Sequence, residues 1–247
     1  MKKPQRILVF SLTYLPFVGG AELAVKAITD RITSGEIEFD LVTLRFKREL
    51  PRVERVGNIT VHRIGFSRRG ATIGDTFRFP LSLNKALFPF LATWKALQLN
   101  RARHYSAAWA IMANQAGFAA LFFSLFRSHI PFVLTLQEGD PLEHILRRVG
   151  AFKPIFKEIF RRAAVVTAIS IYLAGFAREM GAKGRVEVIP NGVDLKNFQF
   201  SFSAVRPVRH PMSPTRDAMD ERKNGALISQ SGPNEHDSRT SDVEWGQ

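Results

Sequence analysis

Glycines and a carboxylate follow the apolar segment "RILVFS" near the start of the chain. Gly19 and Gly20 form a pair at the expected start of a helix, and Glu22 lies in its first turn. Glycine lets a ligand approach the backbone, and the free N–H groups of a helix start attract a phosphate. The pair therefore predicts a phosphate-binding turn, although a tight turn that needs glycine for its own geometry explains it equally well.

Three polar residues follow a second apolar segment, "PFVLTL". They are Gln137, Glu138 and Asp140. Two carboxylates and an amide at one strand end can bind sugar hydroxyls or help to deprotonate one, so they are the candidate catalytic cluster. The structural alternative is a helix start, with Asp140 as the cap ahead of Pro141.

Two further segments end in residues that could contact a ligand. Ser170 follows "AAVVTAI" and suits either a helix cap or a hydroxyl-binding role. Asn191 and Gly192 follow Pro190 in a turn after "VEVI".

The composition of the chain excludes some kinds of site and partner. The chain has 247 residues, no cysteine, and six histidines without a paired metal-ligand spacing, so no disulfide, thiolate or metal site is expected. The net charge of +13 arises in the first two hundred residues. It favours a phosphorylated ligand or an acidic membrane surface. Nucleic acid is not expected as a partner, because the sequence has no recognition motif for it.

Apolar segments of strand length alternate with segments of helical period. This alternation predicts an α/β fold, a Rossmann-like parallel sheet of six or seven strands with helices on both faces. We expect strands at residues 6–11, 39–45, 59–66, 107–113, 131–137, 163–170 and 185–190, and helices at 20–34, 80–103, 116–126 and 171–181. Pro89 should bend or restart the second helix. The loops at 14–22, 135–141 and 190–194 should lie along one edge of the sheet.

Two segments could be mistaken for export or membrane signals. Residues 1–21 have a basic start and an apolar stretch, but a helix follows at once, which favours a buried first strand. Residues 106–126 are uncharged, but Asn114, Gln115 and Gly117 interrupt them, which favours a strand, a turn and a helix. We therefore expect a cytoplasmic protein, with peripheral membrane contact left open.

The pattern ends near Phe200. Residues 200–247 are rich in Pro, Ser, Asn, Asp and Arg, with isolated apolar residues, so we expect a disordered tail after a domain of residues 1–199.

In their order and spacing, these motifs resemble the amino-terminal, acceptor-side domain of the family-4 retaining glycosyltransferases of GT-B fold. "IPNGVD" with Phe198 is the most specific element, followed by "GGAE" and "TAIS". The resemblance implies transfer of a sugar from a nucleotide-sugar to a lipid or saccharide acceptor, without a metal or cofactor. Gly19, Gly20, Glu22, Asn191 and Gly192 would bind the donor or its phosphates, and Ser170 the acceptor.

The sequence departs from the family pattern in two ways. Gln137 stands where the family commonly has histidine, and it cannot act as a base at neutral pH. The second domain, with its glutamate pair, has no counterpart, so we expect a truncated chain. Glu179 and Glu187 match the pair's spacing, but 13 glutamates make a chance match expected and these two lie in the wrong domain.

Two alternatives stay open. The chain could be a non-catalytic module that binds a membrane surface or a partner glycosyltransferase. The other alternative is NADP binding, because Arg45 ends the second expected strand where an NAD-binding protein would have a carboxylate.

Overall fold

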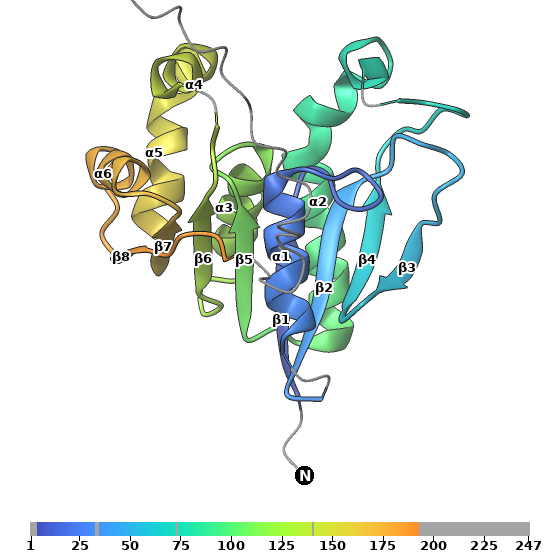
Figure 1. The fold of residues 1–247 in the computed structure, drawn as a ribbon, viewed down its shortest axis with the longest axis horizontal. Coiled ribbons are helices and arrows are strands. Elements are labelled where there is room, and N and C mark those ends of the chain that lie inside the picture. Colours follow the sequence, from blue (N-terminus) through green and yellow to red (C-terminus); the bar gives the residue numbers. More distant parts are fainter. Residues whose placement is uncertain (1–3, 33–34, 73, 140, 193–247) are drawn as a thin grey trace, which may run out of the picture. The chain divides into compact units, whose positions relative to one another are not determined.

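Eight strands among the described residues form one sheet in the order β3-β4-β2-β1-β5-β6-β7-β8. The computed structural model describes residues 4–192 except 33–34, 73 and 140 (Figure 1). The strands are β1 (Gln5–Phe10), β2 (Ile37–Leu44), β3 (Val53–Val56), β4 (Ile59–Ile64), β5 (Ala107–Ile111), β6 (Phe132–Leu136), β7 (Val165–Ala168) and β8 (Arg185–Val188). The expected disordered tail and its boundary lie outside the described residues.

The sheet winds in two directions from β1. Val9 of β1 is paired with Leu41 of β2 on one side and with Trp109 of β5 on the other, and both pairings are parallel. The chain adds β2 and β4 on the first side, then returns to add β5, β6, β7 and β8 on the second. The loop after β1 therefore leads to α1 (Gly20–Asp30) on one face of the sheet, and the loop after β5 leads to α3 (Gln115–Phe126) on the other face. In open α/β sheets such a switch point is where ligands bind.

Helices cover both faces of the sheet, as the sequence predicts (Figure 1). One face packs on α1 through a core that contains Val9, Val25, Leu41 and Ile111. The other face packs on α2, α3, α5 and α6 through a larger, phenylalanine-rich core. The helices are α1 (Gly20–Asp30), α2 (Leu83–Arg103), α3 (Gln115–Phe126), α4 (Leu142–Val149), α5 (Lys153–Arg162) and α6 (Ile171–Glu179), with short 3₁₀ turns η1 (Gly74–Phe77) and η2 (Gly150–Phe152).

All seven expected strands are present, but β3 is an addition. It pairs antiparallel with β4, and Val56 lies opposite Ile59 across the two-residue turn Gly57-Asn58. Gly57 has a φ of 57°, a left-handed conformation that favours glycine. A Gly-Asn pair between two apolar residues is a hairpin signal, so the sequence contained the information for this strand.

Pro89 does not restart the second helix. It lies inside α2, which is continuous from Leu83 to Arg103. The hydroxyl of Thr93 donates to the carbonyl of Pro89 at 2.7 Å and also lies 3.1 Å from the carbonyl of Ala119 in α3. Thr93 thus links the turn that follows Pro89 to α3.

Residues 106–126 form β5, a turn at Asn114 and α3, as expected. No described helix is both long and apolar enough to cross a bilayer.

A buried carboxylate fixes the end of α2 on the sheet. Asp40 of β2 is fully buried. It lies 2.7 Å from His62 Nε2, accepts two contacts from Arg103 Nη1 at 2.8 and 3.0 Å, and accepts the Tyr105 hydroxyl at 2.9 Å. Burial alone would raise the pKa of Asp40, but the hydrogen bonds from His62 and Tyr105 and the charge of Arg103 hold that pKa below its ordinary value.

Candidate functional site

The carboxyl ends of β1, β5, β6, β7 and β8 share one edge of the sheet, because these strands are all parallel. The loops that follow them contain the residues singled out in the sequence. The expectation that the loops after β1, β6 and β8 lie along one edge is therefore confirmed. We call this the carboxyl edge.

Glu138 joins two loops of the carboxyl edge. Its Oε1 accepts a hydrogen bond from the backbone N–H of Ala113, in the loop after β5, at 2.5 Å. Its Oε2 is buried and has no partner among the described residues. Burial raises the pKa of Glu138, and backbone N–H groups, that of Ala113 first among them, oppose this effect only in part. The carboxyl group thus favours its neutral form more than an exposed glutamate does.

Gln137 joins the loops after β6 and β8. Its Nε2 donates to Oδ1 of Asn191 at 3.3 Å. Its Oε1 is buried without a partner among the described residues. Gln137 and Glu138 therefore each have a buried side-chain oxygen without a partner among the described residues, although buried polar atoms of this kind are usually hydrogen-bonded in proteins. Asp140, the third member of the cluster, lies outside the described residues.

The loop after β1 is organised by Glu22. Its Oε1 accepts the hydroxyl of Thr13 at 2.5 Å, and a Cβ on Gly19 would lie 2.6 Å from its Oε2. A side chain at position 19 would therefore displace this carboxylate. Gly20 differs, because a Cβ there would meet no atom within 4 Å. The space in front of Gly20 is open to a ligand, while Glu22 would repel a phosphate that came too close to it.

Arg63 of β4 holds the same loop, a role that the local sequence does not indicate. Its Nη2 donates to the carbonyl of Leu15 at 2.7 Å and pairs with Glu54 Oε1 of β3 at 2.5 Å. The guanidinium is buried, since only 1% of the side chain is exposed. Arg63 and Leu15 are 48 positions apart in the chain, so a local sequence pattern cannot predict their contact.

The loop between β5 and α3 also belongs to the carboxyl edge. A turn is predicted there from the sequence, but it was not assigned to the candidate site. Met112 has a φ of 70°, and Asn114 caps α3 by accepting a hydrogen bond from Ala116 N at 2.9 Å. This conformation points the N–H of Ala113 at Glu138. Asparagine just before an apolar helical segment is a capping signal, and it marks this loop.

Ser170 acts as a helix cap. Its Oγ accepts from the N–H of Leu173 at 3.3 Å, at the start of α6. The hydroxyl proton of Ser170 is still available to a ligand. Gly192 is exposed, and a Cβ there would meet no atom within 4 Å.

Two other interpretations can be compared with the structure. Arg45 donates from Nε to the carbonyl of Leu50 and from Nη2 to that of Arg48, both at 2.8 Å. The guanidinium of Arg45 therefore stabilises the loop after β2. This structural role explains the residue without an NADP phosphate. Glu187 pairs with its neighbour Arg185 in β8, while Glu179 ends α6. Neither glutamate belongs to the cluster of Gln137 and Glu138.

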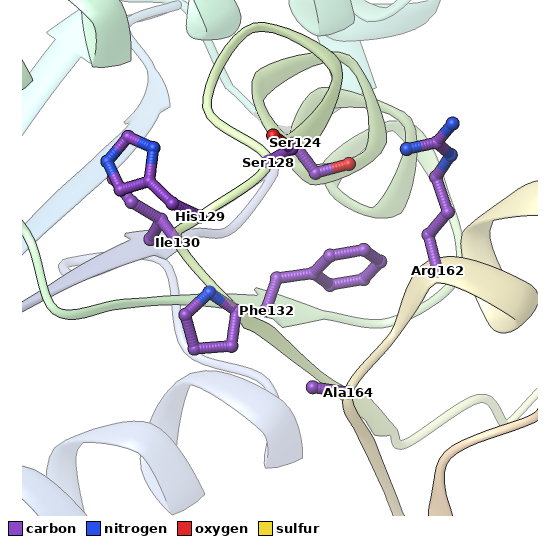
Figure 2. A pocket seen from close by; sticks show the side chains of 8 residues that line it. Ser124, Ser128, His129, Ile130, Phe132, Arg162 and Ala164 are labelled. Carbon is purple, nitrogen blue, oxygen red and sulfur yellow. The ribbon is translucent and has the colours of Figure 1, made fainter.

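A hollow of about 270 Å³ lies at the opposite edge of the sheet (Figure 2). It is lined by residues that immediately precede β6 and β7, among them His129 and Arg162, together with Ser124 of α3. Ser124 already donates to the carbonyl of Leu121 at 2.7 Å. The hollow shares no residue with the carboxyl edge, so it is separate from the candidate site.

Comparison with known proteins identifies the fold and the family. Residues 18–197 match the sequence profile of Glycosyltransferase Family 4. No curated protein matches the sequence. Among solved structures, sucrose-phosphate synthase from Thermosynechococcus elongatus superposes with a TM-score of 0.56 at 16% identity, over 78% of this chain and 49% of that one.

Two further solved structures are similar. An α,α-trehalose-phosphate synthase (UDP-forming) from Burkholderia xenovorans, in complex with glucose-6-phosphate, has a TM-score of 0.52 at 17% identity, over 76% of this chain and 50% of that one. An E. coli structure described as trehalose-6-phosphate bound with UDP-2-fluoro glucose has a TM-score of 0.51 at 13% identity, over 90% of this chain and 54% of that one.

At these identities the likeness establishes the fold, an α/β Rossmann-like domain with GT-B neighbours. The chain spans about half the length of these neighbours. The family profile covers well over half of the chain. The chain therefore belongs to Glycosyltransferase Family 4.

Proposed function

We propose that the carboxyl edge binds the acceptor, and part of the donor, in a reaction that transfers a sugar from a nucleotide-sugar to a lipid or saccharide hydroxyl. The observation that supports this most directly is the pair of buried, unpartnered oxygens, Gln137 Oε1 and Glu138 Oε2. Two such acceptors side by side in the chain suit a ligand that carries several hydroxyl donors. A sugar is such a ligand.

In the proposed reaction, the acceptor hydroxyl attacks the anomeric carbon and the bond to the diphosphate oxygen breaks. The proton passes from the hydroxyl to the departing phosphate. Gln137 cannot take it, and one oxygen of Glu138 is already occupied by the N–H of Ala113. We therefore assign these two side chains to orienting the acceptor rather than to base catalysis. The proposal involves no resident metal or cofactor and places the reaction in the cytoplasm, with configuration retained as the family resemblance implies.

The donor would lie in front of the loop after β1. The open space at Gly20 allows a diphosphate to approach the N–H groups at the start of α1. Thr13 holds the carboxylate of Glu22, which keeps that charge in a defined position beside the site. The described residues supply one wall of such a site. We infer that efficient transfer needs a second, donor-binding unit on the opposite side, because positioning both substrates can account for about 7–11 kcal/mol of the barrier.

Binding and turnover test the proposal separately. Saturation-transfer NMR with the purified chain and a panel of saccharides should detect acceptor binding, and Gln137→Leu and Glu138→Ala should weaken it about tenfold, which corresponds to roughly 1.4 kcal/mol. Glu158→Ala, which removes an exposed partner of Arg161 on α5, is the matched control and should bind normally. Failure of every saccharide to bind, or an equal loss in the control, would refute the acceptor assignment.

Turnover is measured with labelled nucleotide-sugars and the same acceptors. The chain alone should transfer sugar far more slowly than complete enzymes of the family. A rate typical of the family would show that the inferred second unit is not needed.

A further inference from the structure

Helix α2 has apolar side chains on two faces. One face, with Phe88, Ala92 and Ala96, is buried in the core. The other repeats at helical spacing through Leu83, Leu87, Phe90 and Trp94 and is exposed to solvent. Phe90 is 62% exposed and Trp94 61%. A helix that is apolar on both sides usually has a second partner, because a soluble surface rarely exposes such side chains as a continuous group.

Helix α3 enlarges this surface. The ring of Phe90 stacks on Phe122 with a centroid distance of 5.4 Å. One turn further along α3, Leu125 and Phe126 are 53% and 62% exposed. We define the α2–α3 surface as Leu83, Leu87, Phe90, Trp94, Phe122, Leu125 and Phe126.

The charged residues of α2, α3 and the segments next to them in the chain have one sign. Residues 76–137 contain six lysines and arginines and no aspartate or glutamate, so α2 and α3 carry no carboxylate. Lys95 and Arg101 lie on α2 itself, and Arg127 follows α3.

We propose that the α2–α3 surface docks on an anionic lipid bilayer. Exposed leucine, phenylalanine and tryptophan side chains beside lysine and arginine are typical of segments that lie in the membrane interface. The apolar side chains would enter the boundary of the acyl chains, while the cations would meet lipid phosphates. A second copy of this chain fits less well, because a two-fold contact through this surface would bring the same cations together.

The position of α2 links this surface to the carboxyl edge. Asn84, in its first turn, donates from Nδ2 to the carbonyl of Phe66 at 2.8 Å and accepts the N–H of Phe66 at 2.7 Å, just after β4. The parallel strand β4 ends at the carboxyl edge, so α2 starts there too. Docking through α2 would bring that edge close to lipid headgroups. The docking itself does not rest on the proposed sugar transfer and can be tested without it.

Vesicle sedimentation of the full chain tests the proposal. Vesicles of phosphatidylcholine mixed with phosphatidylglycerol should bind the chain at least about tenfold more tightly than phosphatidylcholine alone, and salt should weaken this binding. Leu87→Ser/Trp94→Ser should abolish most of it. The matched control is Ile171→Ser/Tyr172→Ser on α6, which removes two side chains that are 80% and 63% exposed and should leave binding unchanged.

Two further measurements separate docking from a folding defect. Thermal unfolding should show that both double variants remain folded under the conditions of the vesicle assay, because Trp94, Ile171 and Tyr172 are more than half exposed and Leu87 is 37% exposed. Lipids brominated in their acyl chains should quench Trp94 fluorescence, and Trp94→Phe should keep the binding but lose that quenching.

Three outcomes would overturn the proposal. They are equal loss of vesicle binding in both double variants, equal binding to neutral and anionic vesicles, and no binding to either. A concentration-dependent dimer that Leu87→Ser/Trp94→Ser dissociates would also overturn it, in favour of a second copy as the occupant.

Discussion

Glu138 Oε1 lies 2.5 Å from the backbone nitrogen of Ala113, so one carboxyl group fixes the loop after β5 against the loop after β6. The other oxygen of the same group is buried without a partner among the described residues. A single side chain thus connects the stability of the sheet edge with the ligand binding that we propose for it.

The first prediction concerns the charge of Glu138. Burial raises its pKa, so ionisation weakens the fold as pH rises from the unfolded value of about 4.3 through the folded pKa. Glu138→Gln keeps an acceptor for Ala113 and cannot ionise. Its free energy of unfolding relative to the natural chain should therefore increase with pH across this window.

Denaturant unfolding at a series of pH values measures this difference. Glu138→Ala should lose about 1–3 kcal/mol below the unfolded pKa, since it leaves the N–H of Ala113 unpaired, and this loss should shrink as pH rises because alanine cannot ionise either. Glu158→Gln on α5 is the control with an exposed carboxylate and should show little dependence. A Glu138→Gln difference that stays constant with pH would contradict the raised pKa.

The second prediction concerns Asp40. Its folded pKa is lowered, so its contribution is complete above the unfolded pKa of about 3.9 and is lost as pH falls through the folded pKa. Asp40→Asn should cost roughly 3 kcal/mol at neutral pH, because it removes the charge that faces Arg103 inside the protein. Urea titrations should show this loss shrinking in acid. Glu38→Gln, which removes the half-exposed partner of Arg6, should cost under about 1 kcal/mol.

The third prediction concerns the loop after β1. Arg63→Met should destabilise the chain by about 1–3 kcal/mol, because it removes the hydrogen bond to the carbonyl of Leu15. Amide exchange should accelerate in residues 13–20. Arg55→Met, on the exposed side of β3, should change stability by less than about 0.5 kcal/mol. Unchanged exchange in the loop of Arg63→Met would show that Arg63 does not hold it.

The fourth prediction compares two glycines. A Cβ on Gly184 would lie 2.3 Å from the carbonyl oxygen of Ala164 and 2.6 Å from that of Ala163. Gly184→Ala must therefore move β8 away from β7 and should lower the melting temperature. A Cβ on Gly175, inside α6, would meet no atom within 4 Å, so Gly175→Ala should stabilise the helix by up to about 1 kcal/mol. Thermal scans with the opposite order would contradict this assignment.

Most of the parallel strands could be predicted from the sequence because they are rich in apolar residues and buried between two helical layers, as β1, β5 and β6 are. Strand β3 was missed because "VERV" is short and half polar, and only the Gly57-Asn58 turn marks it. Asn191 was predicted as a site residue from its turn, but its contact with Gln137 joins residues 54 positions apart. The roles of Ala113 and Arg63 depend on such long-range contacts, which local pattern does not encode.

The sheet ends in two strands of similar composition, "VERV" at β3 and "RVEV" at β8, each four residues long. The outer edge of a sheet offers unpaired backbone groups to any other extended chain. Short length and charged side chains, here Glu54 and Arg55 on one side and Arg185 and Glu187 on the other, make such pairing between molecules unfavourable. The same charged residues that hid β3 from the sequence analysis, and their counterparts in β8, therefore protect the protein against edge-to-edge aggregation.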